Sequence, residues 1–222
     1  MAIFFDLDGT LVDTCNDIIG AINNLCKELN KPLPDFKLLK DNTSFGLEKI
    51  LAIALNIKIT DLSIEEFNIL KNRFRELYRQ SMFTSSKLFP GLKLLIDKLK
   101  EKDIKVAVVT NKTSEFAIPI LHKVDLANKI DCVVTSDMVP RPKPAPDLVF
   151  LAIKNLQVQP QDCLFIGDAE QDIIAGNAAG VKTAVALFGY IGDENLALNW
   201  PANYFVKKST DLLPLLKNLY KL

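Results

Sequence analysis

A series of short apolar runs without polar alternation constrains the fold of this chain more than any other feature. The runs are rich in Val, Ile and Phe, which is typical of strands that are buried on both faces of a parallel sheet. We assign strands to Ile3–Phe5, Val106–Val109, Cys132–Val134, Cys163–Ile166, Thr183–Leu187 and, more weakly, Tyr204–Val206.

Segments with helical periodicity lie between these runs. They are Leu92–Lys100, Ser114–His122, Asp147–Asn155 and Gln171–Ala179. Pro119 weakens the second assignment, because proline removes a helical hydrogen bond. Strands that alternate with helices predict an α/β fold with a doubly wound, Rossmann-like parallel sheet.

One region breaks this alternation and contains no convincing strand. Its helical segments are Asn16–Leu29, Phe45–Asn56 and Ile64–Ser81. The apolar residues of the first segment recur on one helix face, as in an amphipathic helix. We therefore predict two domains: residues 1–14 and 83–222 form the α/β core, and residues 15–82 form an inserted all-helical domain.

Composition excludes several classes of protein. The 27 basic and 27 acidic residues give no net charge, which argues against a nucleic-acid partner. No apolar run approaches the roughly 20 residues of a membrane helix, and the N-terminus lacks the basic region of a signal peptide. We therefore expect no membrane partner. The four cysteines show no C-x-x-C spacing, so we expect a reduced, cytoplasmic protein.

Polar side chains follow four of the predicted strands. They are Asp6 and Asp8, Thr110 and Asn111, Lys143, and Asp168 and Asp172. Ligands bind at the carboxyl ends of parallel strands, so we expect these side chains to converge. Converging carboxylates are costly unless a cation neutralises them, and Mg²⁺, which prefers oxygen ligands, is the expected cofactor.

These residues carry a resemblance to a known family. The segment Phe5-Asp6-Leu7-Asp8-Gly9-Thr10 resembles the first motif of the haloacid dehalogenase superfamily. Thr110-Asn111, Lys143 and Gly167-Asp168-x-x-x-Asp172 match its second, third and fourth motifs in the right order. The helical insert and the tract from Arg141 to Asp147 resemble the phosphoglycolate phosphatase-like members, in which the insert is a cap. The resemblance covers essentially the whole chain.

The resemblance implies a phosphatase in which Asp6 is the nucleophile. A carboxylate is already ionised at neutral pH and needs no activating base. Asp8 would protonate the leaving oxygen and then deprotonate the hydrolytic water. The resemblance also implies that Mg²⁺ is held by the Asp6 side chain, the Asp8 backbone carbonyl, Asp168, and Asp172 directly or through water.

Thr110 and the backbone N–H of Asn111 would hold phosphate oxygens, and Lys143 would neutralise the phosphoryl charge and orient Asp6. Each residue also has a simpler interpretation. Asp6 and Asp8 suit a turn, Thr110-Asn111 a helix cap, and Lys143 an exposed surface. Asp172 suits a local cap, and that alternative is the strongest of the four.

Substrate choice is expected to come from the cap. The loop Asn42–Leu47 resembles a cap loop that faces the active site, and its N–H groups and hydroxyls suit a carboxylate or a second phosphate. Ser44 alone suits a helix N-cap equally well. Thr14 and Thr84–Ser86 are expected to bracket the hinges, and Lys49 and Arg141 are possible anion partners.

Relatives can be separated by particular residues. Haloacid dehalogenases lack an acid at the position of Asp8, so Asp8 favours phosphate chemistry. Ile18 stands roughly where β-phosphoglucomutases carry a cap histidine, which disfavours a mutase. A small phosphorylated metabolite is therefore the expected substrate, with 2-phosphoglycolate first, and pyrophosphate, a nucleoside monophosphate or a sugar phosphate as alternatives. A non-catalytic binding module is the alternative from another class, and the chain is expected to be a monomer or homodimer.

Overall fold

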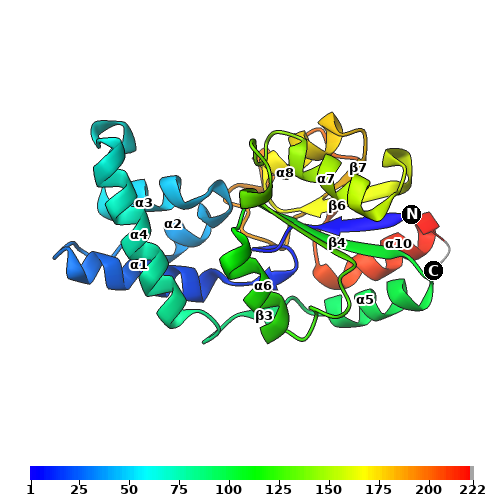
Figure 1. Ribbon diagram of the computed structural model, residues 1–222, viewed down its shortest axis with the longest axis horizontal. Coiled ribbons are helices and arrows are strands. Elements are labelled where there is room, and N and C mark those ends of the chain that lie inside the picture. Colours follow the sequence, from blue (N-terminus) through cyan, green and yellow to red (C-terminus); the bar gives the residue numbers. More distant parts are fainter. Residues whose placement is uncertain (221–222) are drawn as a thin grey trace.

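Six parallel strands form one sheet in the order β5-β4-β1-β6-β7-β8 (Figure 1). The computed structural model of the chain describes residues 1–220. The strands are β1 (Ala2–Phe5), β4 (Lys105–Thr110), β5 (Cys132–Thr135), β6 (Cys163–Gly167), β7 (Lys182–Ala186) and β8 (Tyr204–Val206). Every predicted strand is present, with ends that differ by one residue at most. The α/β class with a parallel sheet is confirmed.

The first strand of the chain lies in the middle of the sheet. Ala2 is aligned with Lys105 of β4 on one side and with Cys163 of β6 on the other. Because all three strands run in the same direction, their carboxyl ends meet at one edge of the sheet. The residues that follow β1, β4 and β6 are therefore brought together.

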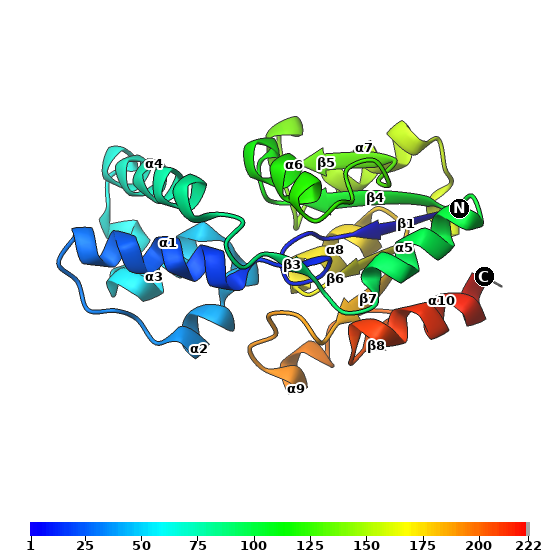
Figure 2. The same ribbon diagram turned by 90° about the horizontal axis from the view of Figure 1, so that it is seen from below.

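Helices cover both faces of the sheet (Figures 1 and 2). They are α5 (Leu92–Glu101), α6 (Ser114–Lys123), α7 (Asp147–Leu156), α8 (Glu170–Ala178) and α10 (Leu212–Tyr220). Ile3 and Phe5 of β1 belong to the core under α5 and α10, whereas Ala2 and Phe4 belong to the core under α7 and α8. This alternation explains the continuous apolar strand sequences, because both faces of each strand are buried.

The predicted helix around Pro119 is confirmed as α6. It continues through Pro119, which removes one helical hydrogen bond, and Phe116 and Ile120 on either side of the proline are buried in the core. Helix α10 and the short helix α9 (Glu194–Ala197) were not predicted.

Residues 15–82, hereafter the helical segment, lie beyond the carboxyl edge of the sheet (Figure 2). Its helices are α1 (Cys15–Glu28), α2 (Phe36–Lys40), η1 (Thr43–Phe45), α3 (Leu47–Leu55), η2 (Ile59–Asp61) and α4 (Ile64–Ser81). The helix predicted from Phe45 begins at Leu47, because Gly46 has a φ of +93° and separates η1 from α3. The division of the chain into two domains stays a prediction.

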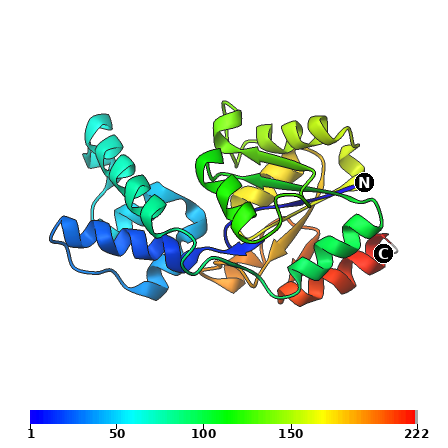
Figure 3. The ribbon, with the colours of Figure 1, turned by 60° about the horizontal axis from the view of Figure 1, so that its bottom comes forward.

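The chain passes twice between the helical segment and the sheet (Figure 3). The two passages pair as a short antiparallel ribbon, β2 (Val12–Asp13) with β3 (Lys87–Leu88). The buried carboxylate of Asp17 accepts hydrogen bonds from the backbone N–H groups of Phe83, Ser85 and Ser86 at 2.8–3.0 Å. Asp17 on α1 therefore ties the outgoing passage to the returning one.

Two further sequence expectations concern thiols and membranes. All four cysteines are free thiols, and only Cys132 is partly exposed. Across residues 1–220, no helix has both the length and the apolar character that crossing a bilayer would need.

Two glycines in helices provide a matched test of the packing. A Cβ on Gly20 of α1 would meet nothing within 4 Å, whereas a Cβ on Gly176 of α8 would lie 2.5 Å from the Thr183 side chain. Gly20→Ala is expected to raise the free energy of unfolding by up to about 1 kcal/mol, the helix-propensity difference. Gly176→Ala is expected to lower it by about 1–3 kcal/mol through overpacking. Thermal unfolding of the two variants measures both effects, and a stabilised Gly176→Ala would contradict the packing described.

Candidate active site

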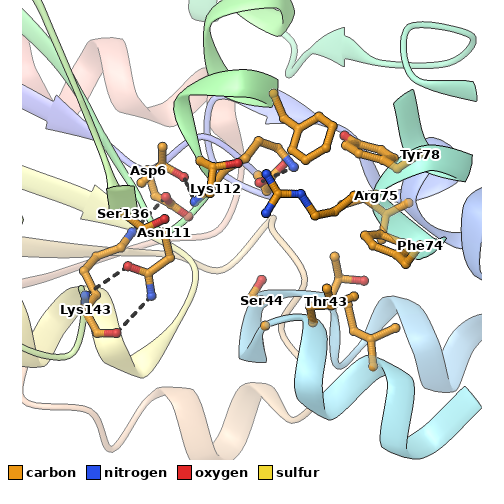
Figure 4. Close-up of a pocket in the computed structure, with 18 of the residues that line it drawn as sticks. Asp6, Thr43, Ser44, Phe74, Arg75, Tyr78, Asn111, Lys112, Ser136 and Lys143 are labelled. Atoms are coloured by element: carbon orange, nitrogen blue, oxygen red, sulfur yellow. Dashed lines mark hydrogen bonds and ion pairs between the residues drawn. The ribbon is translucent and has the colours of Figure 1, made fainter. Parts of the chain in front are cut away.

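Lys143 joins the side chains that converge at the carboxyl edge of the sheet (Figure 4). Its Nζ donates to Asp6 Oδ1 at 2.8 Å and to the Val109 carbonyl at 3.0 Å. The same Nζ is ion-paired with Asp172 Oδ1 at 2.6 Å. Asp6 directly follows β1, and Asp172 lies in the first turn of α8. Lys143 is 3% exposed, so the alternative of a surface lysine is wrong.

Burial perturbs the ionisation of this group. Burial raises the pKa of Asp6 to about 6, against the opposing effect of Lys143 and with the help of the Asp172 charge. Burial also raises the pKa of Asp168 to about 8, and the charges of Asp6 and Asp172 add to that effect. For Lys143, burial opposes the charged form, but the Asp172 and Asp6 charges outweigh it and raise the pKa. Without a further cation, the carboxylates therefore repel one another.

Three of these carboxylates are placed as a set of metal ligands. Asp6, Asp168 and Asp172 each offer an oxygen, and the three oxygens lie within 4.8 Å of one another. All three residues are buried, and oxygen ligands are those that hard divalent cations prefer. The donor set therefore fits a divalent cation, whose charge would offset the burial and the mutual repulsion that raise the pKa values of Asp6 and Asp168.

Asp168 is held from three directions. Thr10 Oγ1 donates to its Oδ1 at 3.0 Å, and the backbone N–H of Tyr190 donates to its Oδ2 at 2.8 Å. Ser44 Oγ of the helical segment also donates to Oδ2, at 2.6 Å. Gly9 packs so closely that a Cβ there would lie 2.1 Å from Asp168 Oδ2. The glycine of the first motif is therefore needed for space as well as for its φ of +81°.

The two carboxylate oxygens of Asp172 have different partners. Its Oδ2 accepts the backbone N–H of Ala169 at 3.0 Å, which is the local capping expected as the alternative. Its Oδ1 faces Lys143. The helix cap thus fixes the carboxylate in the orientation that brings it into the cluster.

Asp8 lies apart from this cluster and has different neighbours. Its Oδ1 accepts the hydroxyl of Thr14, and its Oδ2 is ion-paired with Lys112 Nζ at 3.1 Å. The same Nζ lies 4.8 Å from the ring centroid of Tyr78 on α4. Sequence reasoning missed Lys112, although it directly follows Thr110-Asn111 at the end of β4. That position was the available signal.

Asn111 is hydrogen-bonded to Lys143 of the carboxylate cluster, and Thr110 to Lys112, the partner of Asp8. Asn111 Oδ1 accepts the Lys143 backbone N–H, and its Nδ2 donates to the Lys143 carbonyl, both at 2.9 Å. This pair of bonds fixes the backbone that carries the lysine. Thr110 Oγ1 accepts the Lys112 N–H at 3.1 Å.

A cavity of about 290 Å³ opens between the sheet edge and the helical segment (Figure 4). The sheet side is lined by Asp6, Asp8, Thr110, Asn111, Lys112 and Lys143. The helical segment contributes Ile18, Thr43, Ser44, Gly46, Leu47, Ile50, Lys71, Phe74, Arg75 and Tyr78. The carboxylates of the cavity thus lie on the sheet side, and the helical segment faces them with apolar side chains and two cations.

The loop Asn42–Leu47 faces the cavity, as its resemblance implied. Ser44 lies inside η1, and Gly46 is the N-cap of α3, so the N-cap alternative for Ser44 is wrong. Gln171 Nε2 donates to the Ser44 carbonyl at 2.9 Å, which connects this loop to α8. Gln171 was missed because its role depends on contact with a distant loop.

The two suggested anion partners are not at the cavity. Lys49 is exposed, and Arg141 donates both of its hydrogen bonds to Asp147. Lys71 and Arg75 of α4 are the cations that line the cavity from the helical segment. Their spacing of four residues, with Tyr78 three further on, places them on one helix face and was the signal that was overlooked.

Comparison with known proteins agrees with this geometry. An N-acetylmuramic acid 6-phosphate phosphatase from Pseudomonas putida is 34% identical over 211 residues, which cover 95% of this chain and 93% of the relative. A phosphoglycolate phosphatase from Aquifex aeolicus is 33% identical over 220 residues, 97% of this chain and 96% of the relative. The solved structure of a predicted phosphoglycolate phosphatase from Haemophilus somnus has a TM-score of 0.84 at 26% identity and covers 96% of both chains.

A model of the haloacid dehalogenase-like hydrolase family matches residues 3–186, a range that includes all four motifs. The chain therefore belongs to the haloacid dehalogenase-like hydrolase family, as one of its phosphatases.

Proposed function

We propose that the protein hydrolyses a small phosphomonoester with Mg²⁺, through an aspartyl-phosphate on Asp6. The observation that carries this proposal is the position of Asp6. Its carboxylate lines the cavity, lies 2.8 Å from Lys143 Nζ, and belongs to the same oxygen cluster as Asp168 and Asp172.

In the first half of the reaction, a carboxylate oxygen of Asp6 attacks phosphorus and the ester P–O bond breaks. The leaving oxygen takes a proton from the Asp8 carboxyl, which lines the same cavity. Lys143 and Thr110 stabilise the phosphoryl oxygens, while Lys143 also fixes the orientation of Asp6. Phosphoryl transfer depends mainly on such positioning and charge stabilisation.

In the second half, water attacks phosphorus and the bond to Asp6 breaks, which releases phosphate. Asp8, now a carboxylate, takes the proton from the water and returns to its starting state. Lys112, at 3.1 Å from Asp8 Oδ2, and the Thr14 hydroxyl hold the Asp8 side chain through both steps.

Mg²⁺ would be held by the Asp6, Asp168 and Asp172 carboxylates, Asp172 directly or through water, and by the Asp8 backbone carbonyl. Its chemistry there is to neutralise charge on the phosphoryl group. Lys143 contacts both Asp6 and Asp172, so it offsets part of the negative charge of these ligands.

The helical segment is proposed to act as a cap that selects the substrate and excludes bulk water. The Asp17 contacts to Phe83, Ser85 and Ser86 lie beside the expected hinges at Thr14 and Thr84–Ser86. Ile18 lines the cavity where a mutase would need a histidine, which favours hydrolysis over phosphoryl return.

The substrate is proposed to be a small phosphorylated metabolite. 2-Phosphoglycolate is the sequence-based first choice, and the names of the relatives add N-acetylmuramic acid 6-phosphate. Both compounds join a phosphate ester to a carboxylic acid. A panel of phosphoesters containing both compounds, pyrophosphate, nucleoside monophosphates and sugar phosphates ranks them by kcat/KM.

Replacement of the proposed nucleophile tests the mechanism. Asp6→Asn is expected to reduce phosphate release by at least about 10³-fold, because the amide cannot form the acyl phosphate. Phosphate release from p-nitrophenyl phosphate and from the best ester of the panel measures this loss, with EDTA as the metal-free control. Circular dichroism checks that the variant is folded, and undiminished turnover in a folded Asp6→Asn protein would refute the mechanism.

The raised pKa values predict a specific response of stability to pH. Asp6 and Asp168 have folded-state pKa values of about 6 and about 8, above the ordinary 3.8, so the folded protein binds protons that the unfolded chain releases. In the metal-free protein this contribution destabilises the fold progressively as pH rises from about 4 to about 8.

Mg²⁺ binds the ionised carboxylates, so it is expected to raise the Tm of EDTA-treated protein more at pH 8 than at pH 5. Differential scanning calorimetry with and without Mg²⁺ measures the difference. Asp168→Asn is the control, because it removes the carboxylate with the most strongly raised pKa and should shrink the difference. Equal Tm shifts at both pH values would contradict the proposed metal site.

A further inference from the structure

The far wall of the cavity carries positive charge that phosphoryl transfer does not use. Lys112 faces Asp8, and Lys143 faces Asp6 and Asp172, so both are engaged at the sheet edge. Lys71 and Arg75 line the cavity from α4 and contact none of these carboxylates within 4.0 Å. A phosphomonoester without another charge offers no partner to this second cationic group.

Arg75 is aimed into the cavity. In Figure 4 its side chain extends from α4 toward Lys112, Asn111 and Asp6. One of its terminal nitrogens is paired with Glu115 of α6, and its guanidinium carbon lies 5.7 Å from the centroid of the Phe116 ring. These contacts fix the guanidinium, while its remaining N–H groups stay available as donors.

Glu115 does not cancel the charge of Arg75. The same carboxylate is also paired with Arg79, one turn further along α4. One negative charge is thus shared by two arginines, and the trio keeps a net positive charge. Lys71, one turn before Arg75, adds to the potential at this end of the cavity.

The apolar side chains of the cavity place a second requirement on the substrate, which concerns the size of its leaving group. Phe74, Tyr78, Leu47 and Ile50 surround the cationic pair on the helical segment. Glycolate has a single methylene group and would leave most of this surface facing water. A leaving group with a sugar-sized body would cover it and remove apolar area from water.

We propose that Arg75, supported by Lys71, recognises a carboxylate on the leaving group, and that the substrate is a phosphorylated organic acid whose acid and phosphate are separated by a ring-sized body. This inference rests on the proposed phosphatase function and deepens it. Arg75 acts as a specificity-determining residue: it binds the substrate at a distance from the reacting phosphorus.

Matched substrate pairs test the proposal. In the larger pair, N-acetylmuramic acid 6-phosphate carries an acidic ether substituent that N-acetylglucosamine 6-phosphate lacks. In the smaller pair, 2-phosphoglycolate carries a carboxylate where 2-hydroxyethyl phosphate has a hydroxymethyl group. The measured quantity is the ratio of kcat/KM for the acid to that for its neutral counterpart. The wild-type enzyme is expected to prefer the acid in the larger pair by more than in the smaller one.

Arg75→Gln is expected to lower this ratio by about 10- to 100-fold, the range of a charge-assisted hydrogen bond, mainly through the KM of the acid. Arg75→Lys should restore part of it. Arg73→Gln is the control on the same helix, because Arg73 pairs with Glu28 and Glu76, does not contact Glu115 and is not part of the cavity wall. Its ratio is expected to equal that of the wild type.

The outcomes separate this inference from the proposed function. Equal losses on acid and neutral substrates in Arg75→Gln would assign Arg75 to docking of the helical segment through Glu115 and overturn the inference. A wild-type enzyme that prefers the neutral esters would also overturn it, while hydrolysis of p-nitrophenyl phosphate would leave the proposed function standing. Absence of all phosphate release would overturn both.

Discussion

The buried ion pairs of Lys143 are the interaction on which the rest of the site depends. One ammonium group, 3% exposed, is shared between Asp6 and Asp172. Leaving a buried charge without its partner typically costs about 3–5 kcal/mol, so the carboxylate cluster and the loop that carries the lysine stabilise one another. Asn111 completes this arrangement, because it fixes the lysine backbone from the neighbouring strand. The sheet edge is therefore built as one electrostatic unit and not as a set of independent residues.

The two sides of the cavity differ in chemical character. The sheet edge presents the carboxylates and two lysines, and the helical segment presents apolar side chains with two further cations. Ser44, Gln171 and Asp17 connect the two parts through hydrogen bonds. Because Ser44 donates to Asp168, the loop of the helical segment that lines the cavity is bonded directly to one of the proposed metal ligands.

Sequence reasoning succeeded where local pattern and topology coincide. Continuous apolar runs identify buried strands, and parallel strands bring their carboxyl ends together, so Asp6, Lys143 and Asp168 could be predicted to converge. Lys112 and Arg75 carried only weaker signals, the position after Asn111 and a four-residue spacing on one helix face. Their contacts with Asp8 and with the cavity became evident only from the folded arrangement. The ribbon of β2 and β3 is two residues long in each strand, too short for any periodic pattern. Contacts of this kind arise only from tertiary packing.

The central position of β1 has a consequence for the order in which the protein can assemble during synthesis. β1 is made before both of its neighbouring strands, because Ala2 is aligned with Lys105 and Cys163, which come much later in the chain. Helices α1 and α4 pack against each other and need only the chain between them. The helical segment can thus pack before Lys143 has been made. A nascent chain that stops before β6 would contain every helix of the helical segment but neither Asp168 nor Asp172.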